Sequence, residues 1–380
     1  MILGWTAWPA GAVSPGGAGK LESYQLVQNY PPDGFSVKMY VITYDTPNVD
    51  GTLVVASGLV IIPDPPGQKY ALVSFHHGTM VKREEAPSYP ETCQYVPFLR
   101  EFAGKGKRYV VAMPDYIGIG HSLVRHPFSH ADTEASACLD MLRATKELCS
   151  QLGVQLNSKL FLTGYSQGGG VTMALHRLLE REYAADFPIT ASAPAGGPYD
   201  QLSCWNYGLQ HPTKLWTGVA AYILVAYNRI YKLSSNLDEI FMKRYANLVD
   251  GLFDGTHSLD EINQVLPETV QLLLRPDFLD RFNRGEHPAY QAWVENNTND
   301  WRPLAPVRLY HARGDEAVPY AMAAQTCAHM RSLGADVALV NVGDYEHVPA
   351  FFEALPLIKK WFDSFSPNAA PINNLLLMQN

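Results

Sequence analysis

The chain has 380 residues, of which 47% are hydrophobic and 17% are charged, and its formal net charge is −8 at pH 7. This composition is typical of a folded globular protein with a large core and excludes an intrinsically disordered chain. The mild acidity, without a cluster of lysine and arginine, argues against a nucleic-acid partner. No apolar run approaches the roughly 20 residues that a membrane-spanning helix requires.

The first residues form an apolar stretch of the kind found in export leaders. Residues 1–12 contain two tryptophans and end in Ala10-Gly11-Ala12, a small-residue pattern typical of a cleavage site, although no basic residue precedes them. We interpret residues 1–35 as an N-terminal extension that includes the remnant of a leader. The protein is therefore expected to be secreted or periplasmic, while a cytoplasmic location stays open.

Short apolar runs then alternate with helical patterns, which predicts a mostly parallel sheet with helices on both faces. The runs at 39–44 and 52–62 are expected to pair as antiparallel strands at one edge of this sheet. Further strands are expected at 71–75, 109–113, 160–163, 189–193, 307–310 and 337–340, with helices at 132–152, from 169 onward, at 321–333 and at 349–362. The predicted core comprises residues 1–200 and 300–380.

Residues 201–299 interrupt this alternation, since strand-like runs disappear and helical patterns rich in aromatic residues replace them. Asn236 and Ser258 each begin a segment with the spacing of a helix capping box. The apolar segment 215–227 is short for a membrane span and is expected to be a buried or interfacial helix. We interpret the region as a helical lid or cap over a pocket. A structural subdomain without a role in substrate binding is the alternative.

The pentapeptide Gly164-Tyr165-Ser166-Gln167-Gly168 lies between a predicted strand and a predicted helix. In that context a G-x-S-x-G sequence forms a sharp turn that exposes the serine hydroxyl at the top of the sheet. Gly164 and Gly168 let the strand and the helix pack closely, and the Gln167 N–H is directed toward the same point as the hydroxyl. Because such pentapeptides also arise by chance, Ser166 needs a base and an acid before it can be called a nucleophile.

Candidates for both partners follow later strands, in the order acid and then histidine that such a sheet requires. Asp315 directly follows the strand at 307–310, with Glu316 and Asp344 as alternatives. His347 follows the strand at 337–340 and is expected on a loop before the last helix. The other histidines considered lie inside predicted helices or precede the serine, namely His121, His126, His130, His176 and His329.

An oxyanion site needs a second N–H besides that of Gln167, donated from the loop after the third predicted strand. This loop reads His76-His77-Gly78-Thr79. Gly78 allows the loop to approach the reacting carbon, and the Thr79 N–H is the predicted donor. The paired histidines also suggest zinc, but neighbours on an extended chain point in opposite directions and no carboxylate completes the set. We expect neither a metal nor an organic cofactor.

With these segments in place, the chain resembles the α/β-hydrolase superfamily and, within it, the secretory lipase family, of which fungal lipase A is the best-known type. The resemblance covers most of the chain, from about 40 to 362, and also rests on the segments 114–122, 126–128 and 130–132. It implies a structural role for Asp115, which would hold a loop against the sheet.

The same resemblance implies hydrolysis of carboxylic esters, with Ser166, Asp315 and His347 as the catalytic triad. The expected enzyme is a carboxylesterase or a triacylglycerol lipase that forms an acyl-enzyme on Ser166 and acts on a small-molecule ester or a lipid. Its lid is expected to contact a lipid interface transiently. A peptidase or an acyltransferase with the same triad is the alternative, and a non-catalytic binding protein on this scaffold is a third hypothesis.

The five cysteines, an odd number, leave at least one thiol unpaired. Cys138 and Cys149 lie in one predicted helix, roughly 16 Å apart along its axis, which is too far for a disulfide. Cys93 has several potential partners, and the sequence does not choose among them. The full set is Cys93, Cys138, Cys149, Cys204 and Cys327.

Overall fold

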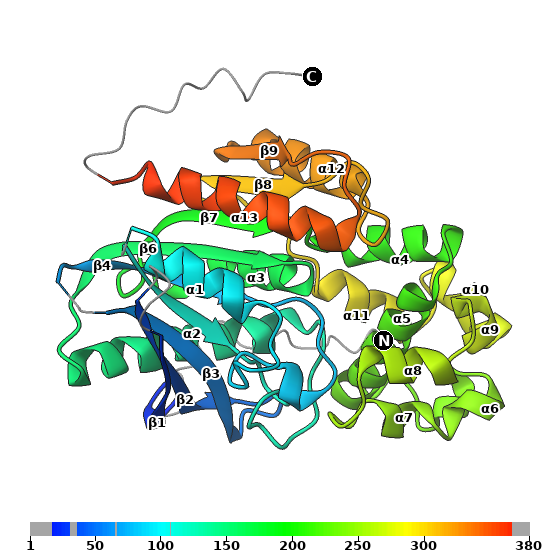
Figure 1. The fold of residues 1–380 in the computed structure, drawn as a ribbon. Helices are drawn as coiled ribbons and strands as arrows, with labels where there is room; N and C mark the ends of the chain where they lie inside the picture. The colour runs from blue at the N-terminus through cyan, green and yellow to red at the C-terminus, as the bar shows by residue number, and fades with distance from the viewer. Residues whose placement is uncertain (1–16, 31–35, 65–66, 107, 367–380) are drawn as a thin grey trace.

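A twisted nine-stranded sheet organises the computed structural model, which describes residues 17–30, 36–64, 67–106 and 108–366 (Figure 1). The predicted leader at 1–12 lies outside these residues. The strands are β1 (Leu21–Tyr30), β2 (Val37–Pro47), β3 (Leu53–Pro63), β4 (Tyr70–His76), β5 (Tyr109–Pro114), β6 (Leu156–Tyr165), β7 (Ile189–Ala195), β8 (Val307–His311) and β9 (Val337–Asn341). Their order in the sheet is β1-β2-β3-β5-β4-β6-β7-β8-β9.

The sheet is parallel from β5 to β9 and antiparallel at its other edge. Strand β4 pairs in parallel with β5 and β6, and the run continues through β7, β8 and β9. Strands β1, β2 and β3 pair antiparallel with each other, and β3 joins β5 antiparallel. The predicted fold class, a mostly parallel sheet with an antiparallel edge, is confirmed.

Helices cover both faces of the sheet because alternate residues of its central strands are buried on opposite sides. On β4, Val73 and Phe75 pack with α1 and α13, whereas Leu72 packs with α2 and α3. The layer of α2 and α3 continues to α12, whose Met322 shares a cluster with Met173 of α3. The bounds are α1 (Val96–Gly104), α2 (Ala131–Gln151), α3 (Gln167–Glu182), α12 (Tyr320–Ser332) and α13 (His347–Asp363). The sequence patterns did not predict α1.

The edge strand β1 corrects the interpretation of residues 1–35 as an extension, since residues 21–30 belong to the sheet. Leu21 is buried, but Tyr24 and Leu26 are 43% and 45% exposed, and Glu22, Ser23 and Gln25 are polar. An edge strand that buries one apolar side chain has almost no hydrophobic alternation, so its sequence carries little strand signal. Its ladder with β2 and a hydrogen bond from the Leu21 N–H to Glu147 Oε2 hold it in place.

Residues between β7 and β8 form a group of helices, which we call the cap helices, at one end of the sheet (Figure 1). They are α4 (Gln201–Gln210), α5 (Lys214–Tyr231), α6 (Lys243–Ala246), α7 (Val249–Leu252), α8 (Leu259–Val265), α9 (Val270–Leu273), α10 (Pro276–Asn283) and α11 (Pro288–Glu295). Most of their buried apolar side chains belong to one cluster that is largely separate from the clusters under the sheet.

The two predicted capping boxes have different outcomes. At α8, the Ser258 hydroxyl accepts from the Glu261 N–H while the Glu261 carboxylate accepts from the Ser258 N–H, so this box is confirmed. Asn236 instead begins a short 3-10 turn, Leu237–Glu239, and the carboxylate of Glu239 accepts from Ser234. Ser234, two residues before Asn236, therefore binds the Glu239 carboxylate that would accept from the Asn236 N–H in a capping box.

The apolar segment 215–227 lies inside α5, where most of its side chains are buried, as predicted. In the part of the chain that the structure describes, no helix is both long enough and apolar enough to cross a membrane.

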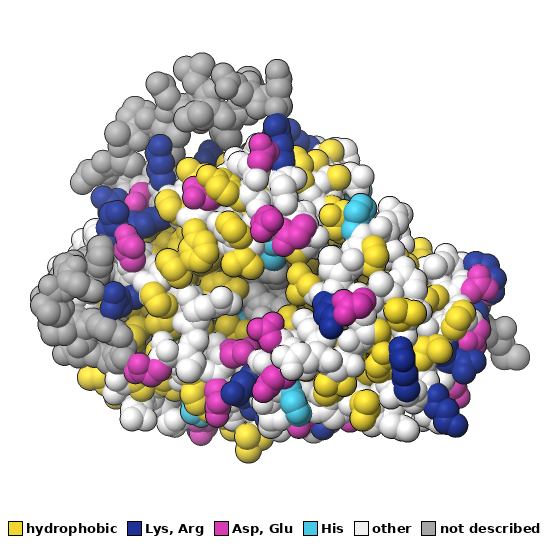
Figure 2. All heavy atoms as spheres, turned by 45° about the vertical axis from the view of Figure 1, so that its right-hand side comes forward, with side chains coloured by type: hydrophobic (Ala, Val, Ile, Leu, Met, Phe, Trp, Pro, Cys, Tyr) yellow, Lys and Arg dark blue, Asp and Glu magenta, His cyan; other side chains and the backbone are white. Residues whose placement is uncertain are grey.

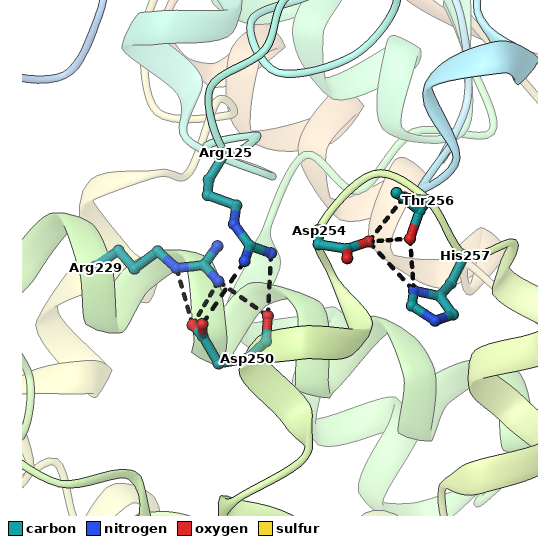
Figure 3. A network of polar contacts seen from close by, with 6 residues as sticks. All are labelled: Arg125, Arg229, Asp250, Asp254, Thr256 and His257. Carbon is teal, nitrogen blue, oxygen red and sulfur yellow. Dashed lines mark hydrogen bonds and ion pairs between the residues drawn. The ribbon is translucent and has the colours of Figure 1, made fainter.

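Polar contacts also join the cap helices to the core, at the place drawn in Figure 3. Arg125, on the core loop before α2, donates to the carbonyl of Asp250 at 3.2 Å, and Arg229 of α5 donates to the Asp250 carboxylate. Beside them, the Asp254 carboxylate accepts from the N–H and the hydroxyl of Thr256 and closes a turn. Because these groups are exposed, each pair contributes about 0–1 kcal/mol.

All five cysteines are free thiols, and all are buried. The open choice of partners for Cys93 is therefore resolved against any disulfide. Cys93 packs among apolar side chains under α1, where burial raises the pKa of its thiol to about 12.

Candidate active site

Three side chains that follow three different strands meet at the carboxyl edge of the sheet. Ser166 ends the β6 connection, Asp315 follows β8, and His347 follows β9. The Ser166 Oγ lies 2.9 Å from His347 Nε2, and His347 Nδ1 lies 2.8 Å from Asp315 Oδ2. Since an ionised carboxylate only accepts, Nδ1 carries the proton and Nε2 is left to accept from the serine hydroxyl.

The Asp315 carboxylate is buried but well supplied with donors. Its Oδ1 accepts from the N–H groups of Ala317 at 3.0 Å and Val318 at 2.7 Å, and its Oδ2 also lies 3.3 Å from His311 Nε2. Burial raises the pKa of this carboxyl, but the hydrogen bonds from His311 and His347 outweigh burial and hold the pKa well below its usual range. Asp315 is therefore ionised at neutral pH. The sequence did not point to His311 as one of these partners.

The two alternative acids do not contact the histidine ring. Asp344 is exposed, and Glu316 accepts from the backbone N–H of His347 at 2.8 Å. That bond anchors the start of α13, of which His347 is the first residue. The prediction that His347 lies on a loop before the last helix is therefore wrong, because His347 belongs to that helix. The helix was predicted to begin at Pro349, but proline is tolerated throughout the first turn of a helix, and here it is the third residue of α13.

The turn at Ser166 has the strained geometry that the pentapeptide predicts. Ser166 has φ 59° and ψ −123°, a conformation that non-glycine residues seldom adopt. The flanking glycines serve close approach and not a positive φ. A Cβ at Gly164 would lie 2.4 Å from the carbonyl oxygen of Gly168, and one at Gly168 would lie 2.0 Å from that of His76.

The replacement Gly168→Ala is accordingly expected to destabilise the protein by about 3 kcal/mol or more, because its methyl group would collide with backbone that cannot move aside. Gly170→Ala is the matched control, two residues along the same helix. Its Cβ would meet nothing closer than 3.6 Å, so this variant should be at least as stable as the parent. Urea unfolding measures both. Equal stability of the two variants would contradict the close approach at Gly168.

The loop after β4 lies against the nucleophile turn. A Cβ at Gly78 would be 3.3 Å from the Ser166 Cβ and 2.5 Å from the Tyr95 hydroxyl. The ring nitrogens of His76 lie within hydrogen-bond distance of Thr172 and Ser74, at 2.8 and 2.9 Å. Those of His77 face the carbonyls of Gly78 and Asp115. The histidine pair therefore braces this loop through protein contacts.

Asp115, directly after β5, holds a loop against the sheet as expected. Its carboxylate accepts from the Ser57 hydroxyl at 2.5 Å and from the Ser88 N–H at 2.9 Å, and its side chain is fully buried. Burial raises the pKa of this carboxyl. It has no contact with Ser166, which fits a structural role.

A cavity of about 290 Å³ opens beside Ser166, Gln167 and His347. Thr79, the predicted second oxyanion donor, also lines it. Most of its wall is apolar, and the cap helices contribute Cys204, Trp205, Leu215, Trp216, Val219, Ala220, Ile223, Leu259 and Trp293. In Figure 2, which brings the right-hand side of Figure 1 forward, hydrophobic side chains gather on either side of a hollow in the surface.

Glu134 is a residue near the site that the sequence did not single out. It lies in the first turn of α2, where acidic side chains usually complement the helix dipole in solvent. Here the side chain is buried, and its Oε1 accepts from the Gln167 side chain at 2.6 Å. No local sequence signal distinguishes the two situations, because the partner is 33 residues away.

Comparison with known proteins shows which family and which solved structures the chain resembles. The sequence profile of the family described as secretory lipase matches residues 102–264. A secreted triacylglycerol lipase of Malassezia globosa is 24% identical over 255 residues, which cover 65% of this chain and 52% of that protein. The chain thus spans about half the length of the curated relatives it matches.

Solved structures align over nearly the whole chain. A structure from Legionella pneumophila has a TM-score of 0.86 and 31% identity, and the alignment covers 93% of this chain and 100% of that one. The rice cell wall degrading esterase LipA of Xanthomonas oryzae has a TM-score of 0.83 and 27% identity, with 91% and 98% covered. The chain has the α/β-hydrolase fold, and its residues 102–264 match the secretory lipase family.

Proposed function

We propose that this protein hydrolyses carboxylic esters through an acyl-enzyme on Ser166. The observation that carries the proposal is the continuous hydrogen-bonded series from Asp315 through His347 to Ser166, at the floor of an apolar cavity. The family, and relatives described as triacylglycerol lipases and as an esterase, support the same chemistry.

In the proposed reaction, the Ser166 Oγ attacks the ester carbonyl while His347 Nε2 takes the hydroxyl proton. The negative oxygen of the tetrahedral intermediate accepts from the N–H groups of Gln167 and Thr79, each worth about 3 kcal/mol of transition-state stabilisation. The intermediate collapses as His347 returns the proton to the leaving alcohol. Water then attacks the acyl-enzyme with His347 again as the base, and the acid product leaves Ser166 free.

The apolar wall of the cavity favours an ester with a hydrocarbon acyl group over a peptide. We assign residues 201–299 as a cap over this pocket, inserted into a core of residues 1–200 and 300–380. Transient contact of the cap with a lipid surface, and secretion like that of the relatives, belong to the same proposal. No specific observation favours a peptidase or an acyltransferase.

A fluorophosphonate probe should label the protein once, on Ser166, and the protein should hydrolyse p-nitrophenyl butyrate. Intact-mass and peptide mass spectrometry check the labelling, and absorbance checks the hydrolysis. Failure of both would overturn the proposal. A series of acyl lengths, below and above the solubility limit, then divides the substrate class: a rise in rate at the interface identifies a lipase, and a preference for short soluble esters identifies an esterase.

A further inference from the structure

A buried polar cluster behind the nucleophile turn joins the cap helices to the core. We call it the cap–elbow cluster, and its side chains are those of Glu134, Gln167, Gln201, Tyr227 and Asn296, all buried. Two of them come from the core, on α2 and α3, and three come from α4, α5 and the residue that ends α11. The backbone of residues 129–131 lies between the two groups and bonds to both.

On the core side, one carboxyl oxygen joins the first residue of α3 to the loop before α2. Glu134 Oε1 accepts from Gln167 Nε2 at 2.6 Å and from the Ser129 N–H at 3.0 Å. Gln167 is the first residue of α3, directly after Ser166, and its own N–H is the proposed oxyanion donor. The side-chain bond to Glu134 therefore fixes the residue whose backbone faces the reacting carbonyl.

On the cap side, three side chains hold the segment that presents Ser129. The Ser129 carbonyl accepts from the Tyr227 hydroxyl at 2.8 Å and from Gln201 Nε2 at 3.2 Å. Asn296 Oδ1 accepts from the Ala131 N–H at 2.7 Å. Ser129 has φ 60°, an unfavourable conformation for serine that the surrounding bonds must maintain. The position of the cap helices thus sets the position of Ser129, and through it that of Glu134.

The charge state of Glu134 follows from its surroundings. Among the described residues, no lysine, arginine or histidine forms an ion pair with Glu134, and burial raises the pKa of its carboxyl to about 8. His126 faces Gln167 from the loop before α2, and burial lowers its pKa to about 3, so it is neutral. The other titratable groups that face the carboxyl have pKa values raised by burial and are neutral as well: Tyr116, Cys138, Tyr222 and Tyr227.

We propose that Glu134 is a positioning residue that transmits the seating of the cap helices to the oxyanion donor at Gln167. The inference rests on the proposed ester hydrolysis. A carboxyl group buried without a cation is costly, and an apolar side chain of similar volume would pack at lower cost if packing were its only role. Gln167 Oε1 is also buried without a partner in the described structure. An unpaired buried polar atom is costly, which again argues against packing as the only role of these side chains.

The test compares Glu134→Ala, Gln167→Ala and the double variant, with Glu134→Gln as the conservative replacement. Each single alanine variant is expected to lower kcat by about 10- to 100-fold with KM unchanged, because a misplaced donor weakens the transition state and not the bound ester. The kcat of the double variant should be no lower than that of the less active single variant, since both changes break the same hydrogen bond. Glu134→Gln should restore most of kcat. Asp140→Asn, a buried carboxyl on the same helix paired with Arg143, is the matched control and should leave kcat unchanged.

The pH dependence gives a second readout. The carboxyl binds its proton up to about pH 8 in the folded state but only to about pH 4.5 when unfolded, so its contribution to stability falls between these values. The melting temperature of the parent should decline across that window relative to Glu134→Gln.

The outcomes separate the two proposals. If the parent shows no hydrolysis that depends on Ser166, the proposed function itself is wrong. If the parent is active and Glu134→Ala lowers only the melting temperature, with kcat and the rate of fluorophosphonate labelling unchanged, Glu134 is structural and the inference is wrong. Additive losses in the double variant would also overturn it.

Discussion

Replacement of Ser166 by alanine is expected to lower kcat/KM for p-nitrophenyl butyrate by about 10⁴-fold or more. Among the residues that the structure describes, no other nucleophile lies within hydrogen-bond distance of His347 Nε2. A small residual rate is expected, since the oxyanion donors and the pocket still bind the substrate. Initial rates measured with purified protein, titrated for contaminating hydrolase with the fluorophosphonate probe, give the ratio.

Two controls keep this result interpretable. Thermal unfolding of Ser166→Ala should resemble that of the parent, because alanine suffers the same backbone strain and the buried side of the turn is unchanged. Ser203→Ala, on α4 next to the pocket, removes a hydroxyl that donates to Asp200 in the described structure, and this variant should retain full activity. A Ser166→Ala variant with activity similar to the parent would eliminate the acyl-enzyme mechanism.

Replacement of Asp315 by asparagine is expected to lower kcat by about 10⁴-fold at neutral pH. The amide would present an N–H toward His347 Nδ1 in place of an acceptor, so the proton moves to Nε2 and the ring can no longer accept from Ser166. Asp344→Asn, in the exposed loop before His347, is the control and should be as active as the parent. Loss of activity in Asp344→Asn alone would reassign the acid.

The same substitution has a signature in stability. Since the folded-state pKa of Asp315 is held well below its usual range, its ionised form stabilises the fold above the unfolded pKa of about 3.9. That contribution is lost as the pH falls below this value. Urea unfolding of the parent should therefore weaken from pH 5 to pH 3 by more than that of Asp315→Asn.

The sequence predicted the sheet well because its central strands are buried on both faces. Leu72, Val73 and Phe75 need an apolar environment on either side, and such runs stand out without further information. The position of Ser166, Asp315 and His347 after three different strands predicted that these side chains would share an edge, since the carboxyl ends of parallel strands lie together. Edge strand β1 escaped notice because solvent faces most of its side chains and leaves no periodic pattern.

Features that depend on distant partners could not be predicted. The single bond from the Glu134 carboxyl to Gln167 crosses 33 residues, and an acidic residue in a first helical turn has an ordinary local explanation. Asn236 had the spacing of a capping box, but Ser234 competed for the same carboxylate. The sequence offered several disulfide partners for Cys93, whereas in the structure this thiol is surrounded by apolar side chains. In each case the contacts of the side chain depend on a neighbour that the local sequence pattern does not identify.

The buried free thiols carry a practical consequence. Stability of this fold owes nothing to covalent cross-links, so it should form equally well in a reducing cytosol and an oxidising medium. Burial also raises the pKa of every one of the five thiols, which leaves almost no thiolate for alkylating agents to attack at neutral pH. A cysteine introduced on the surface, for example on the cap helices, would then be the most reactive thiol and could carry a spectroscopic label without removal of the native five.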